Sequence, residues 1–228
     1  VALLGERVVK GGYDLAVAFD GDADRCLAVD EKGRVVDGDQ MIAIFAAALK
    51  AQGRLRGNTA VVTVMSNYGF FQFAKRHGID TRVTKVGDRY VLEAMLKEGY
   101  CLGGEQSGHI IFSDYMSTGD GQLSALQLMA AMKATGKPLS ELAAAMQVMP
   151  QLLLNVEATR DMKAALHESV ELTEIVHRCE DQLEGRGRVL LRPSGTEPLI
   201  RVMVEGDDQE EIAALAQTIA RAIEQYLR

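Results

Sequence analysis

The sequence has few cysteines and no apolar run long enough to cross a membrane. Its three cysteines, Cys26, Cys101 and Cys179, are odd in number, far apart, and match no CxxC or zinc-ligand spacing. This pattern argues against a disulfide framework and favours a reducing, cytoplasmic location. The longest strongly apolar stretch, residues 41–49, falls well short of the ~18 residues that a membrane-spanning helix needs. No signal-peptide layout opens the chain, so we expect no membrane partner.

A basic charge balance is also lacking. The 228 residues carry 25 Lys and Arg against 32 Asp and Glu, a formal net charge of −7, so we expect no nucleic-acid partner. Any anionic ligand must therefore be held by a few local cationic and backbone groups. The composition, 47% hydrophobic and 25% charged, is that of a globular protein with one large domain or two small ones. Because the chain starts at Val1 without a methionine, we expect it to be part of a longer protein.

The first two-thirds of the chain predict strands that alternate with helices. Three short strands are expected first, followed by a helix that Asp39 caps and Gly53 ends. Further strands and helices then alternate, with Asp88 expected to cap the helix that ends at Gly99. This order indicates an α/β fold with a mixed or parallel sheet covered on both faces, in which ligands bind at the carboxyl ends of the strands. The expected strands are 15–19, 25–29, 34–36, 59–65, 81–85 and 100–103, and the expected helices are 39–53, 70–76, 88–99 and 120–136.

The last third of the chain predicts a separate α+β unit. We place the boundary at Met149-Pro150, after a short helix that follows Lys137-Pro138. Beyond it we expect a strand, a helix, two strands joined by a turn, and a final helix. These elements are residues 152–157, 161–179, the strands on either side of 192–198, and the helix from about 208.

Three carboxylates at alternate positions follow an apolar strand in the sequence DGDADR at residues 20–25. A glycine-containing turn can bend Asp20, Asp22 and Asp24 around one ion, and Mg²⁺ accepts carboxylate oxygens together with water or phosphate oxygens. Crowded carboxylates repel one another unless a cation joins them. The turn therefore predicts a metal site rather than a solvated acidic turn, with Arg25 placed to hold a phosphate beside it.

A calcium-binding loop is the alternative interpretation of these residues. Asp20, Asp22, Asp24 and Glu31 fall at loop positions one, three, five and twelve. Arg25, however, takes the sixth position, where the turn requires glycine, and strands rather than helices are expected on both sides. The pattern therefore disfavours an EF-hand.

A second polar loop, GGEQSGH at residues 103–109, lies between two short apolar runs. Its glycines would let the backbone approach a ligand. Glu105 and Ser107 would bracket neighbouring sugar hydroxyls as acceptor and donor, and His109 would stabilise a phosphate or relay a proton. A glycine-rich turn with a structural histidine explains the same residues, so this loop indicates a ligand-binding function only in combination with the other two loops.

A third loop, RPSGTEP at residues 192–198, is typical of a phosphate-binding turn. It supplies backbone N–H, hydroxyl and guanidinium donors between two strands. Glu197 is expected to orient an arginine rather than to touch the ligand. A tight turn with arginines facing solvent is the alternative. The predicted phosphate-binding residues are Arg192, Ser194, Gly195, Thr196 and Arg201.

Together, and in this order, the three loops resemble those of the α-D-phosphohexomutase superfamily: a DGDADR metal loop, a GEQSGH sugar loop and an RPSGTEP phosphate loop. The resemblance covers essentially the whole chain. It implies that residues 1–36 are the end of the family's second domain, 37–149 its third domain and 150–228 its fourth. The first domain is absent from this sequence.

The resemblance also implies a role for each loop. The three aspartates would bind Mg²⁺, and Arg25 would adjoin the reacting phosphate. Glu105 and Ser107 would contact sugar hydroxyls, His109 would lie near the reaction centre, and the third loop would hold the phosphate that is not being transferred. In this family a phosphoserine converts a sugar monophosphate into a bisphosphate, which reorients before it returns the other phosphoryl group. All three loops would then face one cleft.

The residues that vary within the family indicate the substrate. Gln106 and the sequence KVGDR at 85–89 resemble the phosphoglucosamine mutases, whereas phosphomannomutase/phosphoglucomutase relatives usually carry Met and His at the positions of Gln106 and Asp88. The resemblance thus implies a hexosamine phosphate, with Lys85, Asp88 and Gln106 as specificity residues. An acidic Asp88 would also attract a cationic 2-amino group. The alternative substrate assignment is that of a phosphomannomutase/phosphoglucomutase. The sequence does not decide whether the chain forms a homo-oligomer.

One family feature is missing. No segment like the phosphoserine sequence T-x-S-H-N-P occurs, and Ser66-Asn67-Tyr68-Gly69 does not replace it. We therefore expect this chain alone to bind Mg²⁺ and sugar phosphate weakly without turning over. A non-catalytic phosphosugar-binding module is the competing interpretation.

Overall fold

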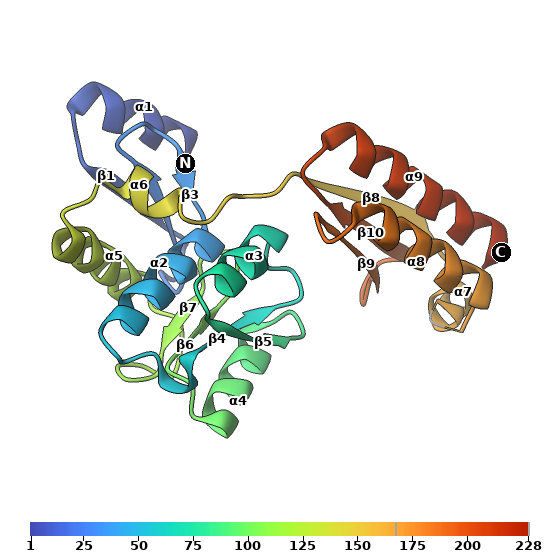
Figure 1. The fold of residues 1–228 in the computed structure, drawn as a ribbon, viewed down its shortest axis with the longest axis horizontal. Coiled ribbons are helices and arrows are strands. Elements are labelled where there is room, and N and C mark those ends of the chain that lie inside the picture. The colour runs from blue at the N-terminus through green and yellow to red at the C-terminus, as the bar shows by residue number, and fades with distance from the viewer. Residues whose placement is uncertain (167, 228) are drawn as a thin grey trace. The chain divides into compact units, whose positions relative to one another are not determined.

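The computed structural model describes residues 1–166 and 168–227, which form two compact units, Val1–Val148 and Met149–Arg228 (Figure 1). Each unit has a hydrophobic core of its own. The largest fully buried side chains of the first unit include Phe70, Phe73 and Met41, and those of the second include Leu172.

The first unit opens with a helix that packs on a small antiparallel sheet. The expected strands are present, but the helix α1 was not predicted. Gly5 of α1 lies so close to the turn at Gly33 that a Cβ on Gly5 would be 2.6 Å from the Gly33 carbonyl oxygen. The elements are α1 (Ala2–Gly11), β1 (Leu15–Phe19), β2 (Cys26–Asp30) and β3 (Val35–Val36), with strand order β1-β2-β3.

The N-cap of helix α2 (Gly38–Ala51) lies two residues before the cap that the sequence predicts. Asp37, not Asp39, is the N-cap: its side chain accepts from the Gln40 N–H, and the Gln40 side chain accepts from the Asp37 N–H. Asp39 is fully buried inside the first turn and accepts from the Asn67 N–H at 2.7 Å. The predicted cap residue therefore joins α2 to the start of the next long helix, α3 (Tyr68–Arg76).

A four-stranded mixed sheet lies at the centre of the first unit, with strand order β5-β4-β6-β7. Strand β4 is parallel to β5 and β6, and β7 is antiparallel to β6, as the α/β prediction requires. Ala60 and Val62 of β4 pack toward the core formed with α2 and α3, whereas Val61 packs against Val91 and Met95 of α4. The strands are β4 (Thr59–Thr63), β5 (Asp80–Thr84), β6 (Leu102–Gly104) and β7 (Ile110–Phe112), with α3 (Tyr68–Arg76), α4 (Asp88–Glu98), α5 (Gly121–Thr135) and α6 (Leu139–Ala143) around them.

Helix α4 also begins differently from the prediction. Asp88 is its first residue, and the N-cap is Gly87 at φ 126° and ψ 133°. That backbone conformation is open to glycine and strained for other residues. Gly87 therefore marks a sharp turn between β5 and α4.

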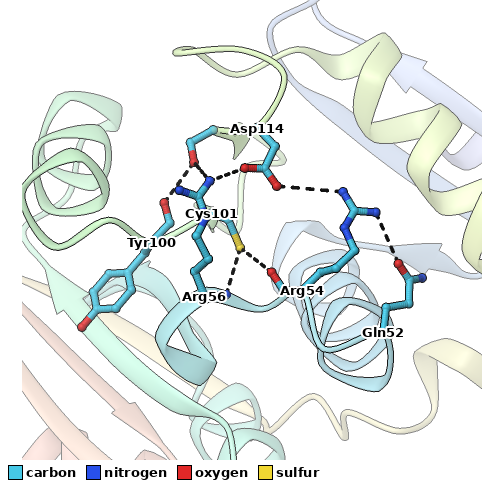
Figure 2. Close-up of polar contacts among 7 residues, drawn as sticks. Gln52, Arg54, Arg56, Tyr100, Cys101 and Asp114 are labelled. Carbon is cyan, nitrogen blue, oxygen red and sulfur yellow. Dashed lines mark hydrogen bonds and ion pairs between the residues drawn. The ribbon is translucent and has the colours of Figure 1, made fainter.

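A polar cluster lies at the end of the central sheet where β4 and β6 begin (Figure 2). The Arg56 guanidinium contacts Asp114 and donates to Ser113 Oγ at 3.1 Å. Arg54 lies 3.9 Å from the other Asp114 oxygen, and the Cys101 thiol faces the Arg54 carbonyl oxygen at 3.4 Å. These contacts join three loops at this end of the sheet, so the loops at the carboxyl ends of β4, β5 and β6 leave from the opposite end.

The second unit is an antiparallel sheet with helices packed on its core. Strand β10 lies between β8 and β9. One helix was expected over 161–179, but the structure has two, α7 and α8, because Ser169 Oγ accepts from the Leu172 N–H and starts a new helix. The elements are β8 (Gln151–Glu157), α7 (Arg160–Ala165), α8 (Val170–Leu183), β9 (Arg188–Pro193), β10 (Leu199–Glu205) and α9 (Gln209–Tyr226).

The structure also shows the surroundings of the cysteines and the apolar character of the helices. Cys26, Cys101 and Cys179 are buried and free. Within residues 1–166 and 168–227, no helix combines the length and the apolar character that crossing a membrane requires.

Candidate active site

The acidic turn after β1 gathers its three carboxylates. One oxygen each of Asp20, Asp22 and Asp24 lies within 4.8 Å of the others. Ala23, between two of them, takes a left-handed conformation with φ 59°, which is uncommon for a residue other than glycine. Its carbonyl oxygen accepts from the Gly121 N–H at 2.9 Å, so the start of α5 holds this turn.

Arg25 closes the acidic turn. Its backbone N–H donates to Asp20 Oδ1 at 3.2 Å, and its Nε lies 2.6 Å from Asp20 Oδ2. Desolvation raises the pKa of Asp20, but the backbone hydrogen bond and the charge of Arg25 outweigh it and lower that pKa. Asp20 therefore stays ionised and ready to bind a cation.

The acidic turn fits a divalent cation. Asp20 Oδ2 and Asp24 Oδ1 are shielded from solvent and accept no hydrogen bond of good geometry from the described residues. Arg25 Nε lies 2.6 and 3.5 Å from these two atoms, and Asp22 adds a third carboxylate to the group. A hard cation such as Mg²⁺ would satisfy the remaining negative charge with the oxygen ligands that it prefers.

The polar loop after β6 lies directly beside the acidic turn. The Cys26 N–H donates to the Gly108 carbonyl oxygen at 3.1 Å, and Arg25 and His109 form an antiparallel bridge. Gly108 has φ 93°, and a Cβ there would lie 2.2 Å from the Cys26 carbonyl oxygen. Glycine is therefore required where the two loops meet, although more than 80 residues separate them in sequence.

His109 contacts the acidic turn through its side chain. Its Nδ1 lies 3.0 Å from Asp24 Oδ2, and its Nε2 accepts from the Gly119 N–H at 3.1 Å. The side chain is only 6% exposed. Both ring nitrogens are thus occupied by protein groups.

Glu105 and Ser107 differ in their surroundings. The Glu105 carboxylate accepts from the Gly87 N–H at 2.9 Å, which joins the polar loop to the turn before α4. Ser107 is exposed and Glu105 is half-buried. The second Glu105 oxygen and the Ser107 hydroxyl are the acceptor and donor that the sugar prediction calls for, and their contact with a sugar stays a prediction.

The three residues predicted to set specificity fall into two groups. Lys85 and Asp88 are exposed, on either side of Gly87. The Gln106 amide instead turns toward Asp37, donating to Oδ2 at 3.4 Å. Gln106 therefore supports the cap of α2, and its effect on the substrate stays a prediction.

Sequence reasoning missed two glycines of this site. Gly87 supplies the N–H that holds Glu105, and its place in KVGDR was a usable signal because glycine marks a sharp turn. Gly119 supplies the N–H that holds His109. Nothing in its local sequence distinguishes it from an ordinary turn.

The predicted phosphate loop lies in the second unit, as the turn from β9 to β10. Arg192 and Arg201 are direct cross-strand partners, so their side chains share one face of the sheet. Ser194 is buried and its Oγ accepts from the Glu197 N–H at 3.2 Å, whereas Gly195 and Thr196 are exposed. This turn therefore offers two guanidinium groups and an exposed hydroxyl.

Glu197 pairs with one of these arginines, as its expected orienting role requires. Arg201 Nη2 donates to Glu197 Oε2 at 2.6 Å. Arg201 Nε is shielded from solvent and has no hydrogen-bond partner among the described residues. An anion at this turn would give that Nε–H an acceptor.

Two family models match the chain, one in each unit. The first is the phosphoglucomutase/phosphomannomutase alpha/beta/alpha domain III, over residues 37–149. The second is the phosphoglucomutase/phosphomannomutase C-terminal domain, over residues 153–222.

Among curated relatives, the phosphoglucosamine mutase of Clostridium tetani is 57% identical over 221 residues, which cover 97% of this chain and 49% of the relative. The phosphoglucosamine mutase of Caldanaerobacter subterraneus is 54% identical over 224 residues, 98% of this chain and 50% of the relative. The chain thus spans about half the length of these relatives. A crystal structure of Aspergillus fumigatus N-acetylphosphoglucosamine mutase in complex with GlcNAc-6P and magnesium matches with a TM-score of 0.73 at 23% identity, over 92% of this chain and 48% of that one.

Proposed function

Since this chain belongs to the phosphoglucomutase/phosphomannomutase family, we propose that it supplies the metal, sugar and phosphate loops of a phosphoglucosamine mutase. That enzyme would interconvert glucosamine 6-phosphate and glucosamine 1-phosphate in the cytoplasm, for UDP-N-acetylglucosamine synthesis. The observation that carries the proposal is the direct contact between the acidic turn and the polar loop, through the Cys26–Gly108 hydrogen bond and the His109–Asp24 contact.

The acidic turn would hold the magnesium ion. Asp20, Asp22 and Asp24 provide the oxygens, and Mg²⁺ bound there would neutralise charge on the phosphoryl group being transferred. Arg25 contributes a guanidinium that is half exposed; its Nε faces Asp20, and its Nη groups would bind a phosphate. The phosphorylated serine that exchanges phosphoryl groups belongs to no segment of this sequence.

The polar loop would orient the sugar. Glu105 is held by the Gly87 N–H through one carboxylate oxygen, which fixes the other as an acceptor for a hydroxyl group. The Ser107 hydroxyl is exposed two residues away and can act as donor or acceptor. Because hydroxyl groups occur on both sides of the ring, such a grip tolerates the two orientations that a bisphosphate intermediate must adopt.

The turn between β9 and β10 would bind the phosphate that stays in place. Arg192 and Arg201 share one sheet face, and two guanidinium groups bind a phosphate dianion with charge-assisted hydrogen bonds.

Glucosamine is favoured over glucose or mannose because Asp88 is exposed beside Gly87, which itself contacts Glu105. A carboxylate near that point would attract a protonated 2-amino group.

The test is a substrate comparison with the protein encoded by the complete gene. We expect a higher kcat/KM for glucosamine 6-phosphate than for glucose or mannose 6-phosphate, with turnover that requires Mg²⁺. A preference for mannose or glucose phosphate would favour the phosphomannomutase/phosphoglucomutase alternative. If all three sugars bind and none turns over, the protein is a non-catalytic phosphosugar-binding module.

Asp88 is tested in the same assay. Exchanging Asp88 for His should reduce the preference for glucosamine over glucose phosphate. An unchanged preference would remove Asp88 from the specificity residues and leave the mutase proposal standing.

A further inference from the structure

The polar loop after β6 closes as a four-residue turn. The Gly108 N–H donates to the Glu105 carbonyl oxygen at 3.0 Å, which makes Gln106 and Ser107 the two central residues. The Glu105 carboxylate is held by the Gly87 N–H, and Ser107 is exposed. Gln106 thus lies between the two residues that would bind the sugar, and the direction of its side chain decides whether it can contact a ligand.

The backbone of this turn lies directly on the start of α2. The Gly38 N–H donates to the Gln106 carbonyl oxygen at 3.0 Å. A Cβ on Gly38 would lie 2.1 Å from the Glu105 carbonyl oxygen and 2.7 Å from the Gly108 nitrogen. Glycine is therefore needed at position 38, because the polar loop leaves no room there for a side chain.

The Gln106 side chain makes a second contact with the same end of α2. Its Nε2 donates to Asp37 Oδ2 at 3.4 Å, while Asp37 Oδ1 accepts from the Gln40 N–H at 3.0 Å. One oxygen of the N-cap residue therefore starts the helix, and the other holds the polar loop. Because both the carbonyl group and the amide of Gln106 are bound to α2, its side chain is directed at protein.

We propose that Gln106 is a positioning residue, which anchors the polar loop to the start of α2 and does not itself select the sugar. The anchored loop keeps Glu105 and Ser107 in place to bind hydroxyl groups. This inference rests on the proposed sugar-binding function of the loop. It replaces the specificity role that the family resemblance implies for Gln106, and it leaves Asp88 as the residue beside this loop that would recognise the amino group.

The first test is Gln106→Met in the protein encoded by the complete gene. Methionine keeps the length of the side chain and removes its amide. We expect KM for glucosamine 6-phosphate and for glucose 6-phosphate to rise by the same factor, roughly 3- to 10-fold, the usual effect of losing one hydrogen bond. The value of kcat should change little, because the loop would hold the ground state and the transition state alike. Gln52→Met, the same exchange at an exposed position at the other end of α2, is the matched control and should leave both constants unchanged.

The ratio of the two kcat/KM values distinguishes positioning from selection. A positioning residue affects both sugars equally, so the preference for glucosamine 6-phosphate should stay within about twofold of its original value in Gln106→Met. A larger change in that preference would show that Gln106 selects the sugar and would overturn the proposal. Unchanged KM values for both substrates would also overturn it, because the loop would then not depend on this anchor.

The second test exchanges the donor and the acceptor of the anchor. Gln106→Glu places a second carboxylate against Asp37 and should release the loop. Adding Asp37→Asn restores one donor and one acceptor, keeps a good N-cap residue and returns the net charge to its original value. The readout in the 228-residue chain is NMR hydrogen exchange of the Gly38 amide, which donates to the Gln106 carbonyl oxygen. Exchange should be at least about threefold faster in Gln106→Glu and close to the original rate in the double variant.

The second test needs no turnover, so the two proposals can fail separately. If the double variant exchanges as fast as Gln106→Glu, Asp37 is not the anchor, and the positioning role is wrong while the mutase proposal stands. The same conclusion follows if Gln106→Glu exchanges no faster than the unmodified chain. If the unmodified full-length protein turns over no sugar phosphate, the proposed function is wrong and the positioning role falls with it.

Discussion

The Glu105 carboxylate accepts a hydrogen bond from the backbone N–H of Gly87 at 2.9 Å. This contact joins the loop after β6 to the turn between β5 and α4, so the carboxyl ends of two strands that lie on either side of β4 are fixed to each other. The residue predicted to bind the sugar is therefore oriented by the segment predicted to set specificity. A substitution in either loop should therefore alter the conformation or mobility of the other.

Removing the Glu105 carboxylate should loosen the turn at Gly87. A hydrogen bond to a charged group contributes about 1.5–3 kcal/mol, so Glu105→Ala should speed hydrogen exchange of the Gly87 amide roughly tenfold or more. Glu105→Gln keeps an acceptor oxygen and is the matched control, with a much smaller increase. NMR hydrogen exchange at Gly87 measures both. Equal exchange in the two variants would show that the carboxylate does not hold this turn.

Replacing Gly108 should destabilise the first unit. Its φ of 93° is strained for other residues, and a Cβ would lie 2.2 Å from the Cys26 carbonyl oxygen. Gly108→Ala should therefore lower the free energy of unfolding by at least about 2 kcal/mol. Gly21→Ala, at a position with open space for a Cβ, should stay within about 0.5 kcal/mol of the unmodified chain. Urea unfolding of both variants provides the comparison, and a Gly108→Ala chain of unchanged stability would contradict the observed contact.

Burial should make Cys26 unreactive and its contribution to stability pH-dependent. Desolvation raises the pKa of the Cys26 thiol from 9.0 to about 11. Because the folded pKa is the higher one, the unfolded chain loses the proton first, and stability that is present below pH 9 is lost as the pH rises through 11. Native Cys26 should therefore resist thiol-specific labelling at pH 8 and react after unfolding in urea.

The control for this pH effect is Cys26→Ser. Serine does not ionise in this range, so the difference in unfolding free energy between the two proteins should change between pH 9 and pH 11 and stay constant below pH 8. Rapid labelling of native Cys26, or a constant difference across the whole range, would place this thiol in contact with solvent.

The sequence predicted those parts of the site that depend on local spacing. The alternate aspartates of residues 20–25 form a carboxylate group because they belong to a single turn. Strands of the central sheet were predicted from apolar runs. All five residues of β4 are buried, as a continuous apolar run predicts. Residue type and short-range spacing were enough for these features.

Contacts between distant segments could not be predicted in this way. The Gly119 N–H reaches His109 because the chain returns to the acidic turn before α5, and a turn sequence carries no sign of the partner. Asp37 and Asp39 are both good cap residues. Asp39 was the wrong choice because tertiary packing buries it against the Asn67 N–H. The break before α8 was missed because Ser169 caps a helix without any glycine or proline to mark the end of the previous one.

The arginine pair of the second unit should bind phosphate independently of the metal site. Arg201 Nε has no hydrogen-bond partner among the described residues, and Arg192 shares its sheet face. Charge-assisted hydrogen bonds contribute about 1.5–3 kcal/mol each, so Arg201→Ala should weaken glucosamine 6-phosphate binding roughly 10- to 100-fold in calorimetric titrations. Arg221→Ala removes the same charge from an exposed site on α9 and should have little effect. Because Arg201 belongs to the second unit, Mn²⁺ binding at the acidic turn should be unchanged in both variants. Equal affinity of the two variants for the sugar phosphate would show that this turn does not bind the phosphate, whatever the metal site does.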